Sequence, residues 1–222
     1  MKVACYLATK NALKQTYLST WAQAVYEELI NLGVEIKTDI FDASPRNSSW
    51  KNTDALFLFT HVFERSSPLC RGDNGAPIPL FRLPISDELR EALYFWSKTY
   101  SELDSLYFGS GVLETPAYKE MADCNSRLAT EGRLYCSEIE QATKRQIYYY
   151  LHRYWGRSVG EADRLCPGCG KRWAKESTSG SGLAWFDFQC EPCRLVSHIG
   201  VDISDQRRAK IGEWKKHGLK TK

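Results

Sequence analysis

The sequence predicts an α/β (or α+β) N-terminal domain followed by a small C-terminal domain built around cysteines. Two observations predict it. Over the first 155 residues, apolar side chains alternate in short segments and recur at helical spacing in longer ones. In the last third of the chain, two C-x2-C pairs stand twenty residues apart. With 222 residues and 43% hydrophobic composition, the chain is long and apolar enough to bury a core, which excludes fibrous and wholly disordered classes.

The first sixty residues predict the order β-α-β-β. Residues 2–8 alternate as a strand does, and apolar residues at helical spacing follow over 18–30. Gly33 suits the end of that helix. Residues 34–41 alternate again, and the apolar segment 55–62 has the composition of a buried strand.

The middle of the chain predicts a loop and two helix starts. Proline and glycine are frequent over residues 66–84, so we expect a loop there. Ser86 is a typical capping residue for a helix through Leu103, with acidic residues in its first turn. Thr115-Pro116 is a second start signal, a capping hydroxyl followed by proline.

The N-terminal domain is expected to end near residue 155. A third helix is predicted over 126–143, and the tyrosine-rich segment 146–155 favours a strand. Residues 156–160 resemble a hinge. We therefore divide the chain into an α/β domain (1–155), a ribbon (156–204) and a C-terminal tail (205–222).

The two C-x2-C pairs are the strongest motif. Their sulfurs belong to Cys166, Cys169, Cys190 and Cys193, at the spacing of a zinc ribbon. Four thiolates fill the tetrahedral coordination of one Zn2+ and leave no position for water, so the predicted zinc is structural and not catalytic.

Three strands complete the predicted zinc ribbon. Glycine and serine fill residues 178–182, which is typical of a hairpin loop, and strands are expected over 171–177 and 183–189. Residues 194–201 would add the third strand of a three-stranded zinc ribbon.

Positive charge is concentrated at the C-terminal end. Residues 206–222 contain seven Lys or Arg against one acidic residue, whereas 151–205 are balanced at seven against seven. Such a basic tail attracts nucleic acid, an acidic protein surface or anionic lipid, although short basic ends also serve only for solubility. The candidate nucleic-acid-binding residues are Lys171, Arg172, Lys175, Arg194, Arg207, Arg208, Lys210, Lys215 and Lys216.

Three weaker patterns have structural alternatives. Tyrosines and basic residues are mixed over 148–157, as in platforms that bind single-stranded nucleic acid, but a core strand would look the same, and we favour the strand. The turn 70–73 (Cys-Arg-Gly-Asp) is a candidate enzyme site, and equally a plain polar turn. The remaining cysteines, with two histidines, could form a second metal or nucleophilic site, although buried reduced cysteine is the common case; these residues are Cys5, Cys70, Cys124, Cys136, His61 and His152.

The chain resembles an uncharacterised bacterial family described as zinc-ribbon-containing, with a suspected role in nucleic-acid binding. The resemblance depends on four short motifs: Tyr148 to Tyr154, Gly156-Arg157-Ser158, Cys166-Pro167-x-Cys169 with Trp173, and Pro79 to Pro84. It implies a zinc site and a binding role.

Three functions stay open at this point. The first is a non-enzymatic zinc-ribbon protein that binds nucleic acid. The second is a protein-binding module, such as an adaptor or an immunity-type protein, because the 28 aromatic residues belong to the class that anchors interfaces. The third is an enzyme of unidentified type, the least favoured because P-loop, dinucleotide-binding and nucleophile-elbow motifs are missing from the sequence. No membrane span or signal peptide is expected, so we expect a cytoplasmic location.

Overall fold

The computed structural model describes residues 20–35, 49–63, 67–175 and 183–215. The chain forms two compact units, residues 1–47 and 48–222. In the first unit, helix α1 (Thr20–Asn31) confirms the helix predicted there, and Gly33 follows it with a positive φ of 74°. The strand predicted over 2–8 lies outside the described residues. Of the strand predicted over 34–41, only residues 34 and 35 are described, and neither is in a strand.

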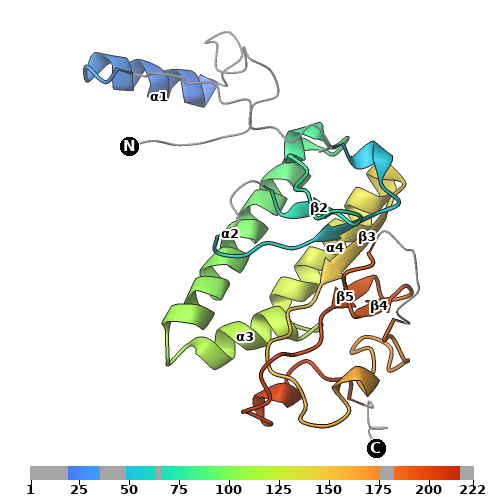
Figure 1. The fold of residues 1–222 in the computed structure, drawn as a ribbon. Coiled ribbons are helices and arrows are strands. Elements are labelled where there is room, and N and C mark those ends of the chain that lie inside the picture. Colours follow the sequence, from blue (N-terminus) through green and yellow to red (C-terminus); the bar gives the residue numbers. More distant parts are fainter. Residues whose placement is uncertain (1–19, 36–48, 64–66, 176–182, 216–222) are drawn as a thin grey trace, which may run out of the picture. The chain divides into compact units, whose positions relative to one another are not determined.

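The second unit is built on a five-stranded mixed sheet with the order β2-β1-β3-β5-β4 (Figure 1). The three central strands β1, β3 and β5 are parallel, and β2 and β4 pair antiparallel at the two edges. The strands are β1 (Ala55–Leu58), β2 (Leu69–Arg71), β3 (Gln146–Tyr150), β4 (Phe188–Cys190) and β5 (Leu195–Ser197).

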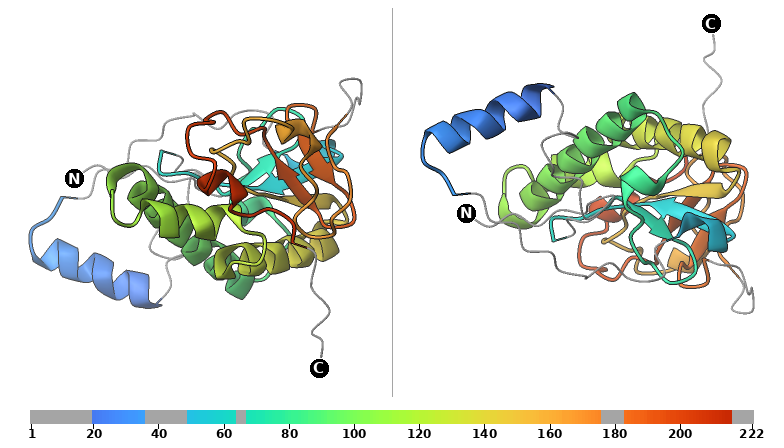
Figure 2. Two further views of the ribbon diagram at one scale, coloured as in Figure 1. Left: turned by 90° about the horizontal axis from the view of Figure 1, so that it is seen from below. Right: turned by 90° about the horizontal axis from the view of Figure 1, so that it is seen from above.

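Three helices lie together on one side of this sheet: α2 (Asp87–Gly109), α3 (Glu114–Ala122) and α4 (Arg127–Thr143) (Figures 1 and 2). Alternate strand residues, such as Leu56 and Tyr149, belong to the large apolar core that includes the helices. The residues between them, such as Phe57 and Tyr150, form a second buried cluster with Leu183. Both faces of the sheet are therefore covered. None of the described helices combines the length and the apolar character that crossing a bilayer requires.

Helix capping explains why two starts were predictable. The hydroxyl of Ser86 accepts a hydrogen bond from the amide of Leu89, and that of Ser126 accepts one from Ala129. The expected start at Thr115-Pro116 is wrong by a residue or two, because α3 begins at Glu114 without a side-chain cap. Proline is tolerated there because the first-turn amides of a helix lack intrahelical partners.

Strands β2 and β3 differ from what the sequence predicted. The segment 66–84, expected as a loop, contains β2, whose three residues are too few for alternation to be recognised. The strand predicted over 146–155 ends at Tyr150, because the amide of His152 leaves the sheet and donates to the carbonyl of Met121 in α3.

The C-terminal cysteine-containing part extends the main sheet, and a three-stranded ribbon is not confirmed. The segment expected as its first strand makes only isolated bridges, Leu165 with Arg172 and Ala174 with Phe188. β4 and β5 are three residues each, and β5 pairs in parallel with β3. The sheet thus crosses the position after residue 155 at which we expected a domain boundary. The expected hairpin loop, 178–182, lies outside the described residues.

Residues 205–215, which we call the C-terminal strap, pack against the rest of the second unit. Arg208–Lys210 form a 3-10 turn in which Ala209 is buried. A Cβ added to Gly212 would lie 1.9 Å from the carbonyl oxygen of Ala122 in α3, and one added to Gly170 would lie 2.4 Å from the ring of Trp214. The first part of the predicted basic tail is therefore folded.

Gly132 in α4 marks a close approach between helix and sheet. A Cβ there would lie 2.4 Å from the ring of Tyr149 and 3.0 Å from Nε1 of Trp96. Overpacking costs about 1–3 kcal/mol, whereas alanine gains at most about 1 kcal/mol in helix propensity. We therefore expect Gly132→Ala to lower the free energy of unfolding by about 1–2 kcal/mol, measured by urea denaturation. Gly109→Ala, which meets no atom within 4 Å, is the control and should not destabilise the protein.

Candidate metal centre

The structure brings four cysteine sulfurs together. Cys166 and Cys169 lie in one turn, Cys190 ends β4, and Cys193 lies in the turn before β5, with all four sulfurs within 4.8 Å of one another. The sulfurs of Cys169 and Cys190 are 3.7 Å apart. Sulfurs at the corners of a tetrahedron with Zn–S bonds of 2.3 Å are about 3.8 Å apart. This spacing is that of a tetrahedral thiolate site.

Tight backbone turns place these sulfurs. In the first turn, the amide of Cys166 donates to the carbonyl of Lys171, and the amide of Gly170 donates to the carbonyl of Cys166, both at 2.8 Å. Gly170 needs its positive φ of 68° to close the turn. A Cβ on Gly168 would lie 2.9 Å from the sulfur of Cys193, so the two turns fit closely. We call residues 166–172 the first knuckle and 190–194 the second knuckle.

The thiols of the cluster differ in acidity. Burial raises the pKa of Cys193 to about 12 and also raises that of Cys166. For Cys169, burial acts in the same direction, but a hydrogen bond from the amide of Lys171 and contacts with the other thiols lower the pKa. In metal-free protein Cys166 and Cys193 are therefore protonated at neutral pH. A metal ion has to displace these protons, and its affinity falls at low pH.

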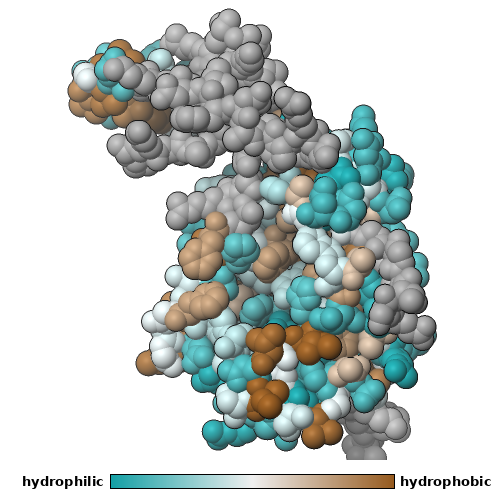
Figure 3. Space-filling view, viewed as in Figure 1, coloured by the Kyte–Doolittle hydropathy of each residue, from teal (hydrophilic) through white to brown (hydrophobic). Residues whose placement is uncertain are grey.

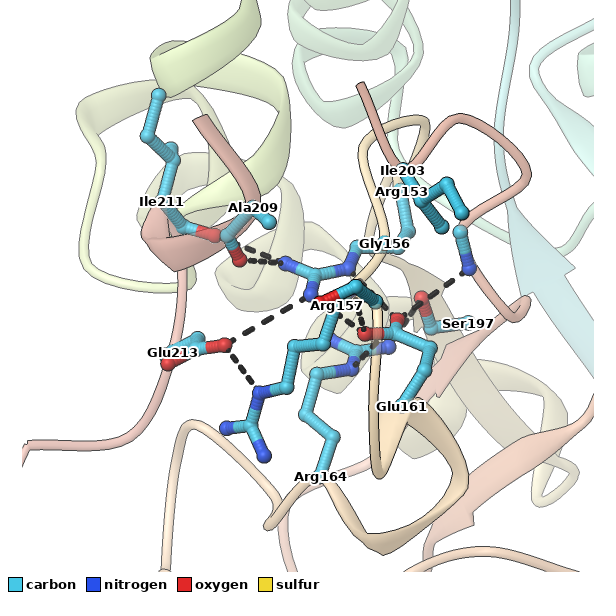
Figure 4. A network of polar contacts seen from close by, with 12 residues as sticks. Arg153, Gly156, Arg157, Glu161, Arg164, Ser197, Ile203, Ala209, Ile211 and Glu213 are labelled. Atoms are coloured by element: carbon cyan, nitrogen blue, oxygen red, sulfur yellow. Dashed lines mark hydrogen bonds and ion pairs between the residues drawn. The ribbon is translucent and has the colours of Figure 1, made fainter. Parts of the chain in front are cut away.

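A buried network of charged residues joins the segment that precedes the first knuckle to the C-terminal strap (Figure 4). Arg153 makes two hydrogen bonds of 2.9 Å to the carboxylate of Glu161, and Nε of Arg164 is 3.6 Å from the same carboxylate. Arg153 also donates to the carbonyls of Ala209 and Ile211 in the strap. The network thus ties the end of β3 to the C-terminal strap.

Arg164 is a second enclosed cation of this network. Its side chain is 2% exposed and its guanidinium lies 4.9 Å from the ring of Trp173 and 4.5 Å from that of Phe188. Burial and the neighbouring Arg153 lower the pKa of Arg164 to about 10. It stays positively charged at neutral pH, two residues before Cys166, where a positive charge would offset that of thiolates holding a metal ion.

Three of the predicted nucleic-acid-binding residues have partners within the protein. Arg194 lies 3.0 Å from Glu140, Arg208 lies 2.8 Å from Glu114, and Nζ of Lys175 donates to the carbonyl of Leu183 at 2.6 Å. These side chains therefore have structural roles in the folded chain.

The other predicted basic residues are exposed. Lys171, Arg172, Arg207, Lys210 and Lys215 make no ion pair within the described residues, and Lys216 lies outside them. Lys171 follows Gly170, and Lys215 follows Trp214. Because Trp214 packs on Gly170, the structure brings together two segments more than forty positions apart that each carry basic residues.

The weaker sequence patterns are mostly structural. Tyr148, Tyr149 and Tyr150 are buried, as a core strand requires. In the turn 70–73, a hydrogen bond from Arg71 lowers the pKa of Asp73, and Cys70 is buried in β2. Cys124 and Cys136 are buried in the core, and Cys5 lies outside the described residues.

Sequence reasoning missed the Arg153–Glu161–Arg164 network and the contact of Trp214 with Gly170. The sequence contained only a weak signal for the charged network. An acidic residue between arginines in an otherwise polar segment is common on protein surfaces, so nothing in the pattern indicated burial.

Comparison with known proteins places the chain among relatives without an assigned function. Residues 50–152 match the family "Domain of unknown function (DUF2310)" and residues 156–203 match "Domain of unknown function (DUF8594)". An uncharacterized protein of Haemophilus influenzae is 32% identical over 202 residues, which cover 88% of this chain and 97% of that protein. A second uncharacterized protein of the same organism is 37% identical over 64% of this chain and 54% of its own length. No solved structure matches. The chain therefore belongs to the same bacterial family as the first of these proteins, and it carries the two domains of unknown function, DUF2310 and DUF8594, one after the other.

Proposed function

We propose that the four cysteines bind one structural Zn2+ ion and that the first knuckle, together with the C-terminal strap, binds the phosphate backbone of nucleic acid. The observation that carries this proposal is the packing of Trp214 on Gly170, which brings two segments that carry basic residues together next to the four cysteines.

The donor set supports zinc and a structural role. Thiolate ligands in a tetrahedral arrangement are typical of Zn2+ or of iron–sulfur clusters, and C-x2-C turns separated by twenty residues are typical of zinc sites. Four sulfurs occupy every coordination position, so the ion would have none left for substrate or water. Its role would be to fix the two knuckles and the side chains that they present.

The exposure of the basic residues supports contact with phosphates. Lys171, Arg172, Lys210 and Lys215 are exposed. Each phosphate that they neutralise releases counterions, so the affinity should fall with salt, with a slope of roughly 0.7 per contact on single strands and 0.9 on duplex.

The test compares two fourfold variants in oligonucleotide titrations at two salt concentrations. Replacing Lys171, Arg172, Lys210 and Lys215 with Gln should weaken binding and reduce the salt slope by about one per lost contact. The control replaces Lys51, Lys98, Lys119 and Lys144, exposed lysines elsewhere on the same unit, and should bind as the unaltered protein does. Equal binding by both variants, or no binding at low salt, would contradict the proposal.

A protein partner is the second candidate. Apolar side chains interrupt the polar surface of the second unit on the face seen in Figure 3. Phe63, Phe108 and Val201 are 80%, 68% and 77% exposed. Exposed aromatic residues are typical anchors of protein interfaces. A pull-down with nuclease treatment separates the candidates: a protein retained after nuclease, and lost in the Phe63→Ser and Phe108→Ser variant, would favour this one.

A further inference from the structure

Three histidines lie at one edge of the sheet. The parallel strands β1, β3 and β5 all end there, and His61, His152 and His198 follow them by three, two and one residues. These are all the histidines of the chain except His217, which lies outside the described residues. The carboxyl edge of parallel strands is where open α/β sheets hold their ligands.

Aromatic contacts bring these histidines together. The ring centroid of Tyr150, the last residue of β3, lies 6.5 Å from that of His152 and 5.7 Å from that of His198. The ring centroid of Phe59 lies 4.6 Å from that of Tyr150 and 5.6 Å from that of His61. The three histidines therefore lie around the Phe59–Tyr150 pair at the carboxyl edge of the sheet, and we call them the histidine row.

Two of the side chains in this row already have features of metal ligands. The Nε2 atom of His152 is buried without a hydrogen-bond partner, although its ring is surrounded by those of Tyr107, Tyr118 and Tyr150. Burial, with a smaller contribution from His198, lowers the pKa of His152 to about 4, so its imidazole is in the neutral form that binds metals.

His198 lies beside a carboxylate that could orient its ring for metal binding. Its Nδ1 lies 3.4 Å from Oδ2 of Asp187, which leaves Nε2 for another partner. Metal-ligating histidines commonly hold a carboxylate in this way, because it fixes the tautomer and orients the ring. His61 is placed differently: its Nδ1 accepts a hydrogen bond from the amide of Phe63 at 3.2 Å.

We propose that this row is a second metal site, in which His152 and His198 bind a divalent ion of the Ni2+, Cu2+ or Zn2+ type and His61 joins as a third ligand. Imidazole nitrogens suit these ions, and the site is independent of the four-cysteine centre. The rings have to rotate to bind, because within the described ranges only the cysteine sulfurs are already gathered at ligand spacing. Rotation of the His61 ring would also break its hydrogen bond with the amide of Phe63.

The experiment measures Ni2+ binding to the full chain with its zinc in place. Zinc-loaded protein is dialysed against NiCl2, and both metals are counted by elemental analysis. We expect one Ni2+ per chain without loss of zinc. His152→Gln and His198→Gln should abolish binding at that stoichiometry, and His61→Gln should weaken it. Asp187→Asn should weaken it roughly 10- to 100-fold, the effect of removing an outer carboxylate.

His217→Gln is the matched control, because it removes the one histidine outside the row and should leave Ni2+ binding unchanged. Circular dichroism checks the fold of each variant. If His152→Gln does not fold, His198→Gln still decides the question, since His198 is 41% exposed. No Ni2+ binding by the unaltered protein, or full binding by His198→Gln, would overturn the proposal. Displacement of zinc by nickel would also overturn it, because the nickel would then sit among the cysteines.

Discussion

Loss of the metal ion proposed for the four cysteines is expected to unfold much of the second unit and not only the knuckles. Cys190 is the last residue of β4, β4 pairs with β5, and β5 pairs with the central strand β3. Structural Zn2+ contributes about 10–16 kcal/mol in zinc-finger peptides, and a whole domain is stable by only about 5–15 kcal/mol. Removing the metal should therefore eliminate most of the free energy of unfolding.

The measurement compares Cys190→Ser with Cys124→Ser, which alters a buried cysteine outside the cluster. Purified protein should contain about one zinc per chain, and Cys190→Ser should lose both the zinc and the cooperative thermal transition. Cys124→Ser should keep its zinc, with at most a moderate fall in melting temperature. A Cys190→Ser variant that melts like the unaltered protein would show that the centre does not stabilise the sheet.

The second large effect is expected from Glu161→Gln. Glu161 is 9% exposed and holds the buried guanidinium of Arg153, with Arg164 next to it. Removing one partner of a buried ion pair costs about 3–5 kcal/mol, because the other charge is left buried without compensation. We expect a loss of that size in the free energy of unfolding, measured with urea.

The control for this prediction is Glu131→Gln, which breaks the exposed pair with Arg127 and should cost at most about 1 kcal/mol.

The stabilisation that Glu161 provides should also depend on pH. Although burial acts in the opposite direction, hydrogen bonds from Arg153 and from the amide of Arg157 lower the pKa of Glu161 below its ordinary value of 4.5. The stabilisation is therefore present above pH 4.5 and lost as the pH falls through the lowered pKa. Equal losses for both variants at neutral pH would contradict the prediction.

Local signals in the sequence predicted the helices and the cysteine cluster. Ser86 caps its helix as expected, because a cap is formed by residues three positions apart. The C-x2-C spacing likewise determines a turn within four residues. Such features depend on neighbours in the chain, so the pattern is enough to recognise them.

Long-range partners could not be predicted in this way. β3 and β5 pair although about 45 residues separate them, and strands of three residues give no alternation to recognise. The ion pairs of Arg194 with Glu140 and of Arg208 with Glu114 could not be predicted for the same reason, because their partners are far apart in the sequence. Composition counts a lysine or arginine as positive charge, but only the fold decides whether an acidic residue lies beside it.

The position of β5 has a consequence for synthesis on the ribosome. β3 is complete at residue 150, but the strand that covers its second edge starts at residue 195. At roughly 5–20 residues per second, the nascent chain carries an apolar, unpaired edge strand for several seconds. Such edges recruit other chains. A chain that stops after residue 155 should therefore aggregate, and timely zinc supply should decide how much full-length protein is recovered in solution.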